Sequence, residues 1–400
     1  MTITKKLMAV AVATAFGLPL AAHAEVTVYG KLYPQINHIS VDDSSAVGTT
    51  VSTLSAKATG TPGTSVTAMQ ASNSRLGFRG NENLGNGMKA IFQLEMNAHI
   101  NDGTGGSTLF SRNTFLGLAG GFGTVKLGKI DTVYKQLGDH LSFLGVSSGN
   151  FVSNSSILAK TGFGTSSASS FHLRRDNSII YYSPKFGGVQ ALFDYSLGQV
   201  PGSASSGSVI SAGLRYKNGP IYLALAHEIH KDLFGGSNNV AAAMSNTKTV
   251  GASSDDTSTR LTAQYHFNKG TIAELDFATT ELNESGGATG HFQDYKHNSY
   301  AVNVQHTMGP VKLQASYAAA TAGSCSLVGG VACNTTGLDG KKLNLGASYS
   351  LSKSTYFFAL YSKMRNGDAA RYNSSELKTA TYIAPGAGTN QFAVGLSHSF

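Results

Sequence analysis

The last ten residues of the chain alternate in character and end on an aromatic residue. In an extended strand, one face would carry Phe392, Val394, Leu396, His398 and Phe400, and the other would carry only small or polar residues. The final residues of a soluble domain usually fray. A strand with lipid on one side and water on the other instead needs one apolar and one polar face along its whole length. The pattern therefore predicts a transmembrane β-barrel.

The first 24 residues have the pattern of a secretory signal peptide. Two lysines are followed by an apolar run over residues 7–20 and by the small-x-small cleavage site Ala22-His-Ala24. We therefore expect a signal peptide over residues 1–24 and a barrel domain over residues 25–400. No later segment approaches the roughly 18 consecutive apolar residues that a spanning helix needs, which excludes a helical membrane protein.

Composition alone would fit a soluble protein, since 41% of the residues are hydrophobic and the mean hydropathy is −0.07. A barrel gives the same average, because outward apolar residues alternate with inward polar ones. Tryptophan is absent, so an aromatic girdle at the membrane interfaces would have to be built from the 17 Tyr and 20 Phe residues.

The net charge is +8, from 30 basic residues, two of them in the signal peptide, and 22 acidic ones. A nucleic-acid-binding protein gathers such charge in patches or runs. Here the charges are scattered along the alternating segments, and the chain is exported. We therefore expect no nucleic-acid partner, with a polyanion-binding face as the weaker alternative.

One theme repeats along the chain: two alternating segments joined by a short turn, then a longer polar loop. The short turns lie at residues 83–87, 119–123, 184–188, 217–220, 268–270, 308–310 and 351–354. With the first and last segments this gives an antiparallel, all-β barrel of about sixteen strands, with short turns at one end and long loops at the other. A soluble β-sandwich would not need this asymmetry. A barrel of this size keeps a water-filled channel.

Cys325 and Cys333 are the only cysteines, and a Gly- and Ser-rich loop contains both. In an exported chain this predicts a disulfide. A zinc site would need further ligands, and His227 and His230 would point to opposite faces of a strand. We therefore expect no metal and no cofactor.

Several motifs occur in a specific order. Ser-Arg-Leu-Gly-Phe-Arg-Gly spans residues 74–80, Asn-Leu-Gly-Asn-Gly-Met-Lys-Ala spans 83–90, Phe-Gly-Thr-Val-Lys-Leu-Gly spans 122–128, and Asn-Ser-Ile-Ile-Tyr-Tyr-Ser-Pro-Lys-Phe-Gly-Gly spans 177–188. Together with the terminal Phe400, they resemble the general porins of Gram-negative bacteria over essentially the whole mature chain. The resemblance implies a homotrimer of sixteen-stranded outer-membrane barrels. In each, a third long loop, here about residues 131–171, would fold into the pore.

The resemblance also implies the partners of the chain. These are outer-membrane lipid and lipopolysaccharide, further copies of the same chain, and small hydrophilic solutes. The outer-membrane assembly machinery is a further partner, because in this family it reads the terminal aromatic strand. Phe400 is accordingly assigned as an assembly signal.

In this family a basic ladder on the barrel wall faces acidic groups on the third loop. The matching wall positions are Lys31, Arg75, Arg112 and Arg175, with Arg79 and Arg174 close by. We expect Arg175, rather than Arg174, to be the main wall charge of that pair. Asp139 matches the acidic side of the constriction.

Strand parity gives the same placement for Lys31, Arg75, Arg79 and Arg112. Each would lie opposite the apolar face of its strand, and a charge facing lipid near mid-membrane costs about 2–4 kcal/mol. These side chains should therefore face the water of the lumen. The alternative is the rim of the barrel, where long basic side chains reach water at little cost.

The sequence predicts a passive diffusion channel with no chemical step. Between residues 131 and 171 the only carboxylates are Asp131 and Asp139, so a basic wall would face a weakly acidic loop and raise anion occupancy. We therefore expect a preference for anions. A substrate-selective outer-membrane channel is the alternative function. An outer-membrane hydrolase would need a nucleophile with its base, and no such set is visible.

Overall fold

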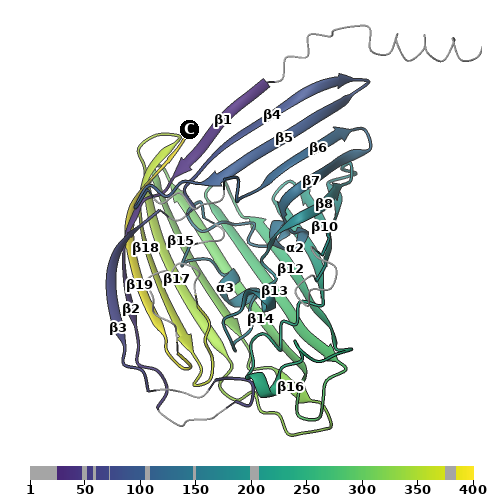
Figure 1. The fold of residues 1–400 in the computed structure, drawn as a ribbon. Coiled ribbons are helices and arrows are strands. Elements are labelled where there is room, and N and C mark those ends of the chain that lie inside the picture. Colours follow the sequence, from purple (N-terminus) through teal and green to yellow (C-terminus); the bar gives the residue numbers. More distant parts are fainter. Residues whose placement is uncertain are drawn as a thin grey trace, which may run out of the picture.

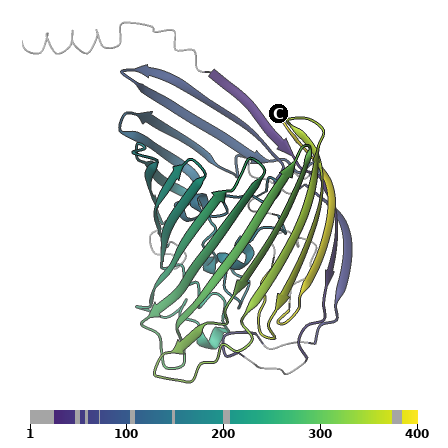
Figure 2. The same ribbon diagram turned by 180° about the vertical axis from the view of Figure 1, so that it is seen from behind.

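The computed structural model describes residues 25–46, 52–56, 60–71, 73–103, 109–146, 150–198, 207–373 and 384–400. The signal peptide expected over residues 1–24 lies outside them. The described residues fold into a closed antiparallel barrel of sixteen strands (Figures 1 and 2). The fold class and strand number expected from the alternation are confirmed. No helix in this part of the chain is long and apolar enough to cross a membrane.

Nineteen strand segments build the sixteen strands. The first strand consists of β1 (Glu25–Leu32) and β2 (Gln35–Val41), and the second of β3 (Thr64–Gln70) and β4 (Arg75–Gly85), since β1 pairs with β4 and β2 with β3. β16 (Ser324–Leu327) is a short extra strand on β14. The remaining strands are β5 (Met88–Asn97), β6 (Thr114–Gly120), β7 (Gly123–Asp131), β8 (Arg174–Tyr182), β9 (Val189–Ser196), β10 (Val209–Asn218), β11 (Ile221–Lys231), β12 (Ser253–His266), β13 (Thr271–Ser285), β14 (Phe292–Met308), β15 (Val311–Ala320), β17 (Gly340–Ser350), β18 (Thr355–Asn366) and β19 (Thr389–Ser399).

The first strand is interrupted at Pro34. Proline has no backbone N–H and cannot donate to the ladder. Its carbonyl oxygen still accepts a hydrogen bond from Leu396 N at 3.2 Å. The interruption therefore leaves β2 and β1 attached to the same neighbour, β19.

Phe400 closes the barrel against the first strand. Its amide donates to Gly30 O at 3.1 Å, and its carbonyl accepts from Gly30 N at 3.0 Å. The Phe400 ring covers Gly30, where an added Cβ would lie 2.4 Å from the ring. A residue without a side chain is therefore needed opposite the terminal aromatic.

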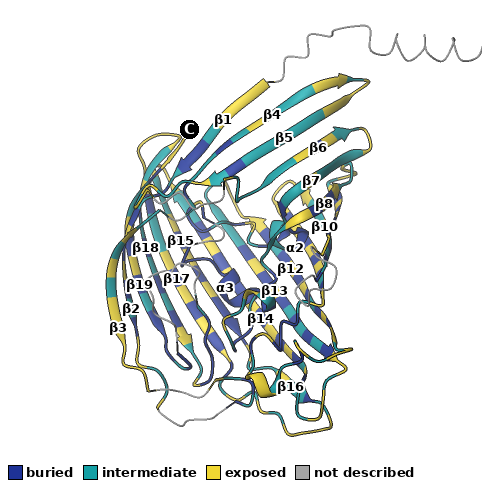
Figure 3. Ribbon diagram, in the orientation of Figure 1, coloured by how far each residue is buried: buried dark blue, intermediate teal, exposed yellow. Residues whose placement is uncertain are grey.

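Burial alternates along the strands with a period of two (Figure 3). In β11, Tyr222, Ala224 and Ala226 are at most 4% exposed, whereas Ile221, Leu223 and Leu225 are at least 37% exposed. The exposed set is apolar and points outward, as a lipid-facing surface requires. The buried set points into the barrel.

Eight long loops leave one end of the barrel, and the short turns and the chain end lie at the other (Figure 1). We number the loops L1 (42–63), L2 (98–113), L3 (132–173), L4 (197–208), L5 (232–252), L6 (286–291), L7 (321–339) and L8 (367–388). L3 carries α2 (Val133–Leu137), α3 (Ser155–Leu158) and the 3₁₀ turn η1 (Ser167–Ser169), and L5 carries η2 (Ala242–Met244). The short-turn end is the periplasmic end by the usual rule for such barrels.

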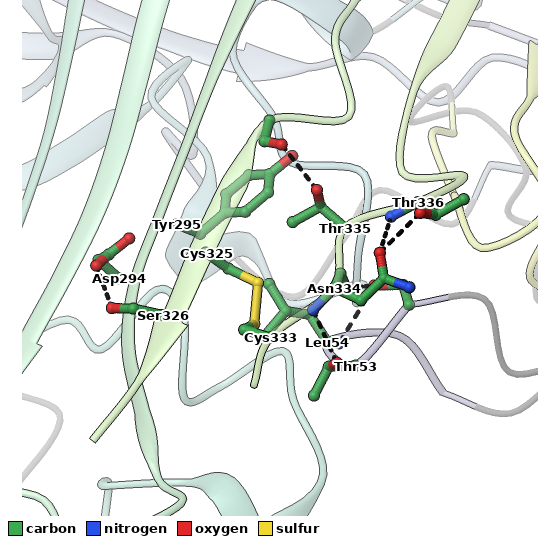
Figure 4. The surroundings of a disulfide bond; sticks show 12 residues. Thr53, Leu54, Asp294, Tyr295, Cys325, Ser326, Cys333, Asn334, Thr335 and Thr336 are labelled. Carbon is green, nitrogen blue, oxygen red and sulfur yellow. Dashed lines mark hydrogen bonds between the residues drawn. A yellow bond between two sulfur atoms is a disulfide. The ribbon is translucent and has the colours of Figure 1, made fainter. Parts of the chain in front are cut away.

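In L7 the structure has Cys325 and Cys333 joined by a disulfide (Figure 4). The residue after it, Asn334, accepts from Thr53 N at 2.8 Å and donates its own amide to Thr53 Oγ1 at 2.9 Å. Leu54 is fully buried in the same cluster of side chains. The described tip of L1 is thus fastened to L7 beside the disulfide.

Candidate functional site

L3 lies against the inner wall of the barrel. α2 packs on β10 and β11, and α3 packs on β14, β15 and β17. The wall residues that hydrogen-bond L3 are buried and polar, and they include Ser211, Tyr222, Asn303, Gln314, Lys342 and Asn344. Because these residues point into the barrel, L3 occupies part of its interior.

A buried ion-pair group ties the middle of L3 to β12 and β13. Arg260 on β12 is 1% exposed, and its Nη2 donates to Asp139 Oδ1 in L3 at 2.7 Å and to Asp276 Oδ1 on β13 at 2.9 Å. Glu274 accepts from Leu141 N at 2.6 Å, two residues beyond Asp139. One guanidinium therefore joins the loop to the wall.

Asp139 differs in role from the sequence expectation. It was expected to face the basic ladder as the acidic side of the constriction. Its carboxylate is 7% exposed and is paired with Arg260, so its charge is compensated inside the loop–wall contact. This partner could not be predicted from the sequence, because 121 residues separate Asp139 from Arg260.

Two of the expected arginines pair with Glu95 on β5, and a third lies on the ring of Tyr29 beside it. Arg112 Nε lies 2.5 Å from Glu95 Oε1, and Arg75 Nε lies 3.7 Å from Glu95 Oε2. Tyr29 OH donates to the same carboxylate at 2.9 Å, and the Arg79 guanidinium lies 4.9 Å from the centre of the Tyr29 ring. Arg75 and Arg112 thus lie around an acidic residue of the wall, and Arg79 lies next to them on the Tyr29 ring.

The alternation predicts that Arg112 lies inside a strand, but in the structure Arg112 precedes β6. β6 begins only at Thr114, and Phe110 has a positive φ of 56°, so the extended backbone does not run from Phe110 to Leu118 as the alternation predicts. The Arg112 amide still donates to Glu95 O at 3.1 Å. This bond keeps the side chain beside β5.

Lys31 spans the gap between the wall and L3. It is 7% exposed, pairs directly across from Arg75, and donates from Nζ to Gly145 O of L3 at 2.7 Å. Its ammonium also lies 4.9 Å from the Tyr33 ring centre. Lys31 therefore contacts the loop itself.

Arg174 and Arg175 separate at a bulge in β8. Asn177 has a φ of 53°, and the register shifts so that Arg175 pairs with Ile130 and Arg174 with Asp131. Arg175 donates to Ser196 Oγ and Gly207 O at 3.4 and 3.2 Å. Arg174 lies 3.0 Å from Asp131, which also binds Lys135 at 2.8 Å.

A cavity of about 750 Å³ lies between L3 on one side and the end of β3, the link from β3 to β4, L2 and L8 on the other. Its basic lining residues are Arg112, Lys135, Lys160, Arg174 and Arg371. Among the described lining residues Asp102 is the only carboxylate, and serine and threonine residues of L3 form much of the rest. Arg174, and not Arg175, belongs to this lining.

The charge state of this cavity follows from its surroundings. Burial lowers the pKa of His172 to about 3, with Lys135 adding to the effect, so this imidazole is neutral at physiological pH. Burial also lowers the pKa of Lys160. Lys160 has no hydrogen-bond or ion-pair partner among the described residues, in contrast to Lys135. Its ammonium is the least compensated charge of the cavity.

Sequence reasoning did not assign Glu95, Lys135, Lys160, Arg260 or Arg371 to the site. Parity in β5 could have found Glu95, because it lies opposite the apolar Phe92, Leu94 and Met96. The loop residues carry no such signal, since an irregular backbone has no fixed period. The described residues contain no group of three or more His, Cys, Asp or Glu that could hold a metal ion.

Comparison with known proteins places this geometry in a family. The sequence model described as Gram-negative porin matches residues 9–369. Outer membrane porin protein 32 of Delftia acidovorans is 28% identical over 99% of both chains. The major outer membrane protein P.IB of Neisseria meningitidis serogroup A is 27% identical over 97% of this chain and 98% of that one.

Solved structures share the fold. The anion-selective porin from Comamonas acidovorans superposes with a TM-score of 0.68 at 24% identity, covering 94% of this chain and 100% of that one. Salmonella typhi OmpF gives a TM-score of 0.60 at 15% identity over 94% and 98%. Because the family model spans most of the sequence, the chain belongs to the Gram-negative porins, which are passive channels of the outer membrane rather than enzymes.

Proposed function

We propose that this porin lets small hydrophilic solutes and ions diffuse passively and that it prefers anions. The observation that carries the proposal is the lining of the cavity beside L3, where five basic side chains accompany one carboxylate. Fixed positive charges in a narrow aqueous passage raise the local concentration of anions. Hydroxyl groups of L3 offer further hydrogen bonds to an anion that sheds part of its hydration shell.

The ion pairs of the wall leave the same sign of imbalance. Arg75 and Arg112 share Glu95, and Lys135 and Arg174 share Asp131, so two carboxylates serve four cations. Arg79 lies on the ring of Tyr29. In this proposal Lys31 belongs to the same basic wall, L3 narrows the pore, and Arg175 braces β8 against L4 behind it. Asp139 restrains L3 through Arg260.

We also propose that the chain assembles as a homotrimer in the outer membrane. OmpT of Vibrio cholerae, which shares this fold with a TM-score of 0.58, has been solved in a trimer form. Each barrel encloses its own lumen, so in this proposal the basic side chains of each subunit set the ion preference of that subunit's pore.

Lys160→Glu should lower the chloride-to-potassium permeability ratio by roughly sevenfold. The change moves two unit charges relative to an ion about 7 Å away in water, and after screening by about 0.1 M salt it shifts chloride and potassium by about 0.6 kcal/mol each, in opposite directions. The ratio is obtained from the reversal potential of pores in a planar bilayer under asymmetric KCl.

The matched control is Lys353→Glu, the same charge change in the exposed turn between β17 and β18. It should leave the ratio close to that of the wild type. Equal effects of the two substitutions would show that the net charge of the protein, and not the cavity, sets selectivity.

A further inference from the structure

An aromatic ring of L3 lies exposed in the lumen, on the periplasmic side of the loop. One face of the His140 imidazole stacks on the Tyr222 ring, with 3.7 Å between the ring centres and 6° between the planes. Tyr222 is the second residue of β11, close to the short turn from β10, and its hydroxyl donates to Leu137 O at 3.0 Å. Because Tyr222 is only 2% exposed, the open face of the stacked pair is that of His140.

Two basic side chains of β10 lie beside this pair of rings. Arg215 and Lys217 are on the inward face of the strand, opposite Leu214, which is 52% exposed on the outer face. Lys217 pairs directly across from Tyr222. Loss of water at the stacked face lowers the pKa of His140 to about 4, and the charges of Lys217 and Arg215 add to the effect. The imidazole is therefore neutral at physiological pH and offers an uncharged π-face next to two cations.

Neither cation has an acidic partner in the part of the chain that the structure describes. Arg215 donates from Nε and Nη2 to Gln190 Oε1, an uncharged acceptor that positions the guanidinium without neutralising it. Its Nη1 and the exposed Lys217 ammonium have no hydrogen-bond acceptor among the described residues. We refer to His140, Tyr222, Arg215 and Lys217 as the His140 site.

The same combination of ring and cation recurs on the preceding strands of the wall. Lys126 on β7 points inward, opposite the outward Leu127, and its ammonium lies 4.3 Å from the centre of the Phe115 ring and 4.8 Å from that of Tyr182. Tyr182 OH donates to Gln136 Oε1 of L3 at 2.8 Å, so this group also borders the loop. Lys126 makes no hydrogen bond or ion pair within the described ranges. A second uncompensated cation with aromatic neighbours therefore continues the His140 site along the wall.

We propose that the His140 site binds a planar aromatic carboxylate, a solute with one ring and one carboxylate group. The ring stacks on the open face of His140 and extends the stack that Tyr222 begins. The carboxylate accepts charge-assisted hydrogen bonds from Arg215 or Lys217. A small inorganic anion has no π-face, and a neutral aromatic solute leaves the cations unpaired, so the site favours a solute that has both groups. The inference rests on the proposed function, because the carboxylate reaches the site only through a lumen that admits anions.

The test compares three solutes of similar size as blockers of the KCl current through single pores in a planar bilayer. Benzoate carries a ring and a charge, cyclohexanecarboxylate carries the charge without a π-face, and benzyl alcohol carries the ring without the charge. The half-blocking concentration of benzoate should be about fivefold lower than that of cyclohexanecarboxylate, because only benzoate can stack on His140. Benzyl alcohol should not block at these concentrations.

Substitutions assign the block to individual side chains. His140→Ala should raise the half-blocking concentration of benzoate about fivefold and leave that of cyclohexanecarboxylate unchanged. His140→Phe should restore the benzoate block, since it keeps a neutral ring on Tyr222. Lys217→Gln should weaken the block by both carboxylates. The controls are His38→Ala, at an exposed histidine of the outer face, and Lys353→Gln, in the turn between β17 and β18, and both should be blocked as the wild type is.

Equal block by benzoate and cyclohexanecarboxylate would overturn the inference, as would a benzoate block that survives His140→Ala or weakens as much in a control. The chloride-to-potassium ratio of the same pores separates this failure from failure of the proposed function. Equal block in a pore that prefers chloride overturns the His140 site alone, whereas a preference for potassium overturns the proposed function whatever the order of the blockers. Heat-modifiable gel mobility confirms that each variant has folded.

Discussion

Arg260→Met should raise the single-channel conductance and make the open current noisier. The guanidinium holds both Asp139 of L3 and Asp276 of the wall, and all three side chains are buried. Removing one member of a buried ion pair typically costs about 3–5 kcal/mol, because the remaining charge is left uncompensated. In the variant, L3 can move so that the Asp139 carboxylate is hydrated by the water of the pore. We therefore expect L3 to detach from the wall, while the hydrogen bonds between the barrel strands stay intact.

Two variants sharpen this experiment. Arg260→Lys keeps the charge but loses the fork that reaches two carboxylates, and it should give an intermediate conductance. Asp139→Asn weakens only the loop side of the contact and should reproduce part of the effect. Single-channel recordings in which Arg260→Met conducts and fluctuates like the wild type would show that the ion pair does not restrain L3.

Deletion of Phe400 should strongly lower the amount of folded porin in the outer membrane and leave the conductance of inserted pores nearly unchanged. The deletion removes both hydrogen bonds to Gly30 and uncovers that residue at the barrel seam. None of the five basic side chains of the cavity beside L3 is hydrogen-bonded or ion-paired to Gly30 or Phe400 in the described structure. The folded fraction is measured by heat-modifiable mobility of outer-membrane extracts, and the conductance in bilayers.

Phe392→Ala is the control for this deletion. Phe392 faces outward on the same strand and is 50% exposed. Its substitution removes an aromatic ring from this strand but leaves the chain end intact. Refolding into detergent separates two causes of a defect. A loss confined to cells supports recognition of Phe400 by the assembly machinery, and an equal loss in detergent supports a role for the seam alone. Normal assembly without Phe400 would contradict both.

The strands could be predicted from the sequence because their period is fixed by the lipid–water boundary. Each outward residue must be apolar and each inward one tolerates water, so parity alone placed Lys31, Arg75 and Arg79 towards the lumen. Departures from the period could not be predicted. The bulge at Asn177 changes which of Arg174 and Arg175 lines the cavity, and β6 begins at Thr114, after Arg112.

The interior of the barrel was less predictable for a different reason. Its contacts join residues far apart in the sequence, such as Arg260 with Asp139 and Lys31 with Gly145. From the sequence alone, each acidic residue of L3 could pair with many basic residues of the wall, because the position of the loop along the wall is unknown. Only the folded barrel shows which pairs meet.

The reversal potential of the wild-type pore under asymmetric KCl tests the central claim most directly. Five basic side chains and one carboxylate line the cavity beside L3, so chloride should cross more readily than potassium. Chloride then leaves the concentrated side faster than potassium does, so the concentrated side should become positive relative to the dilute side. A potential of the opposite sign, set by potassium, would contradict the account.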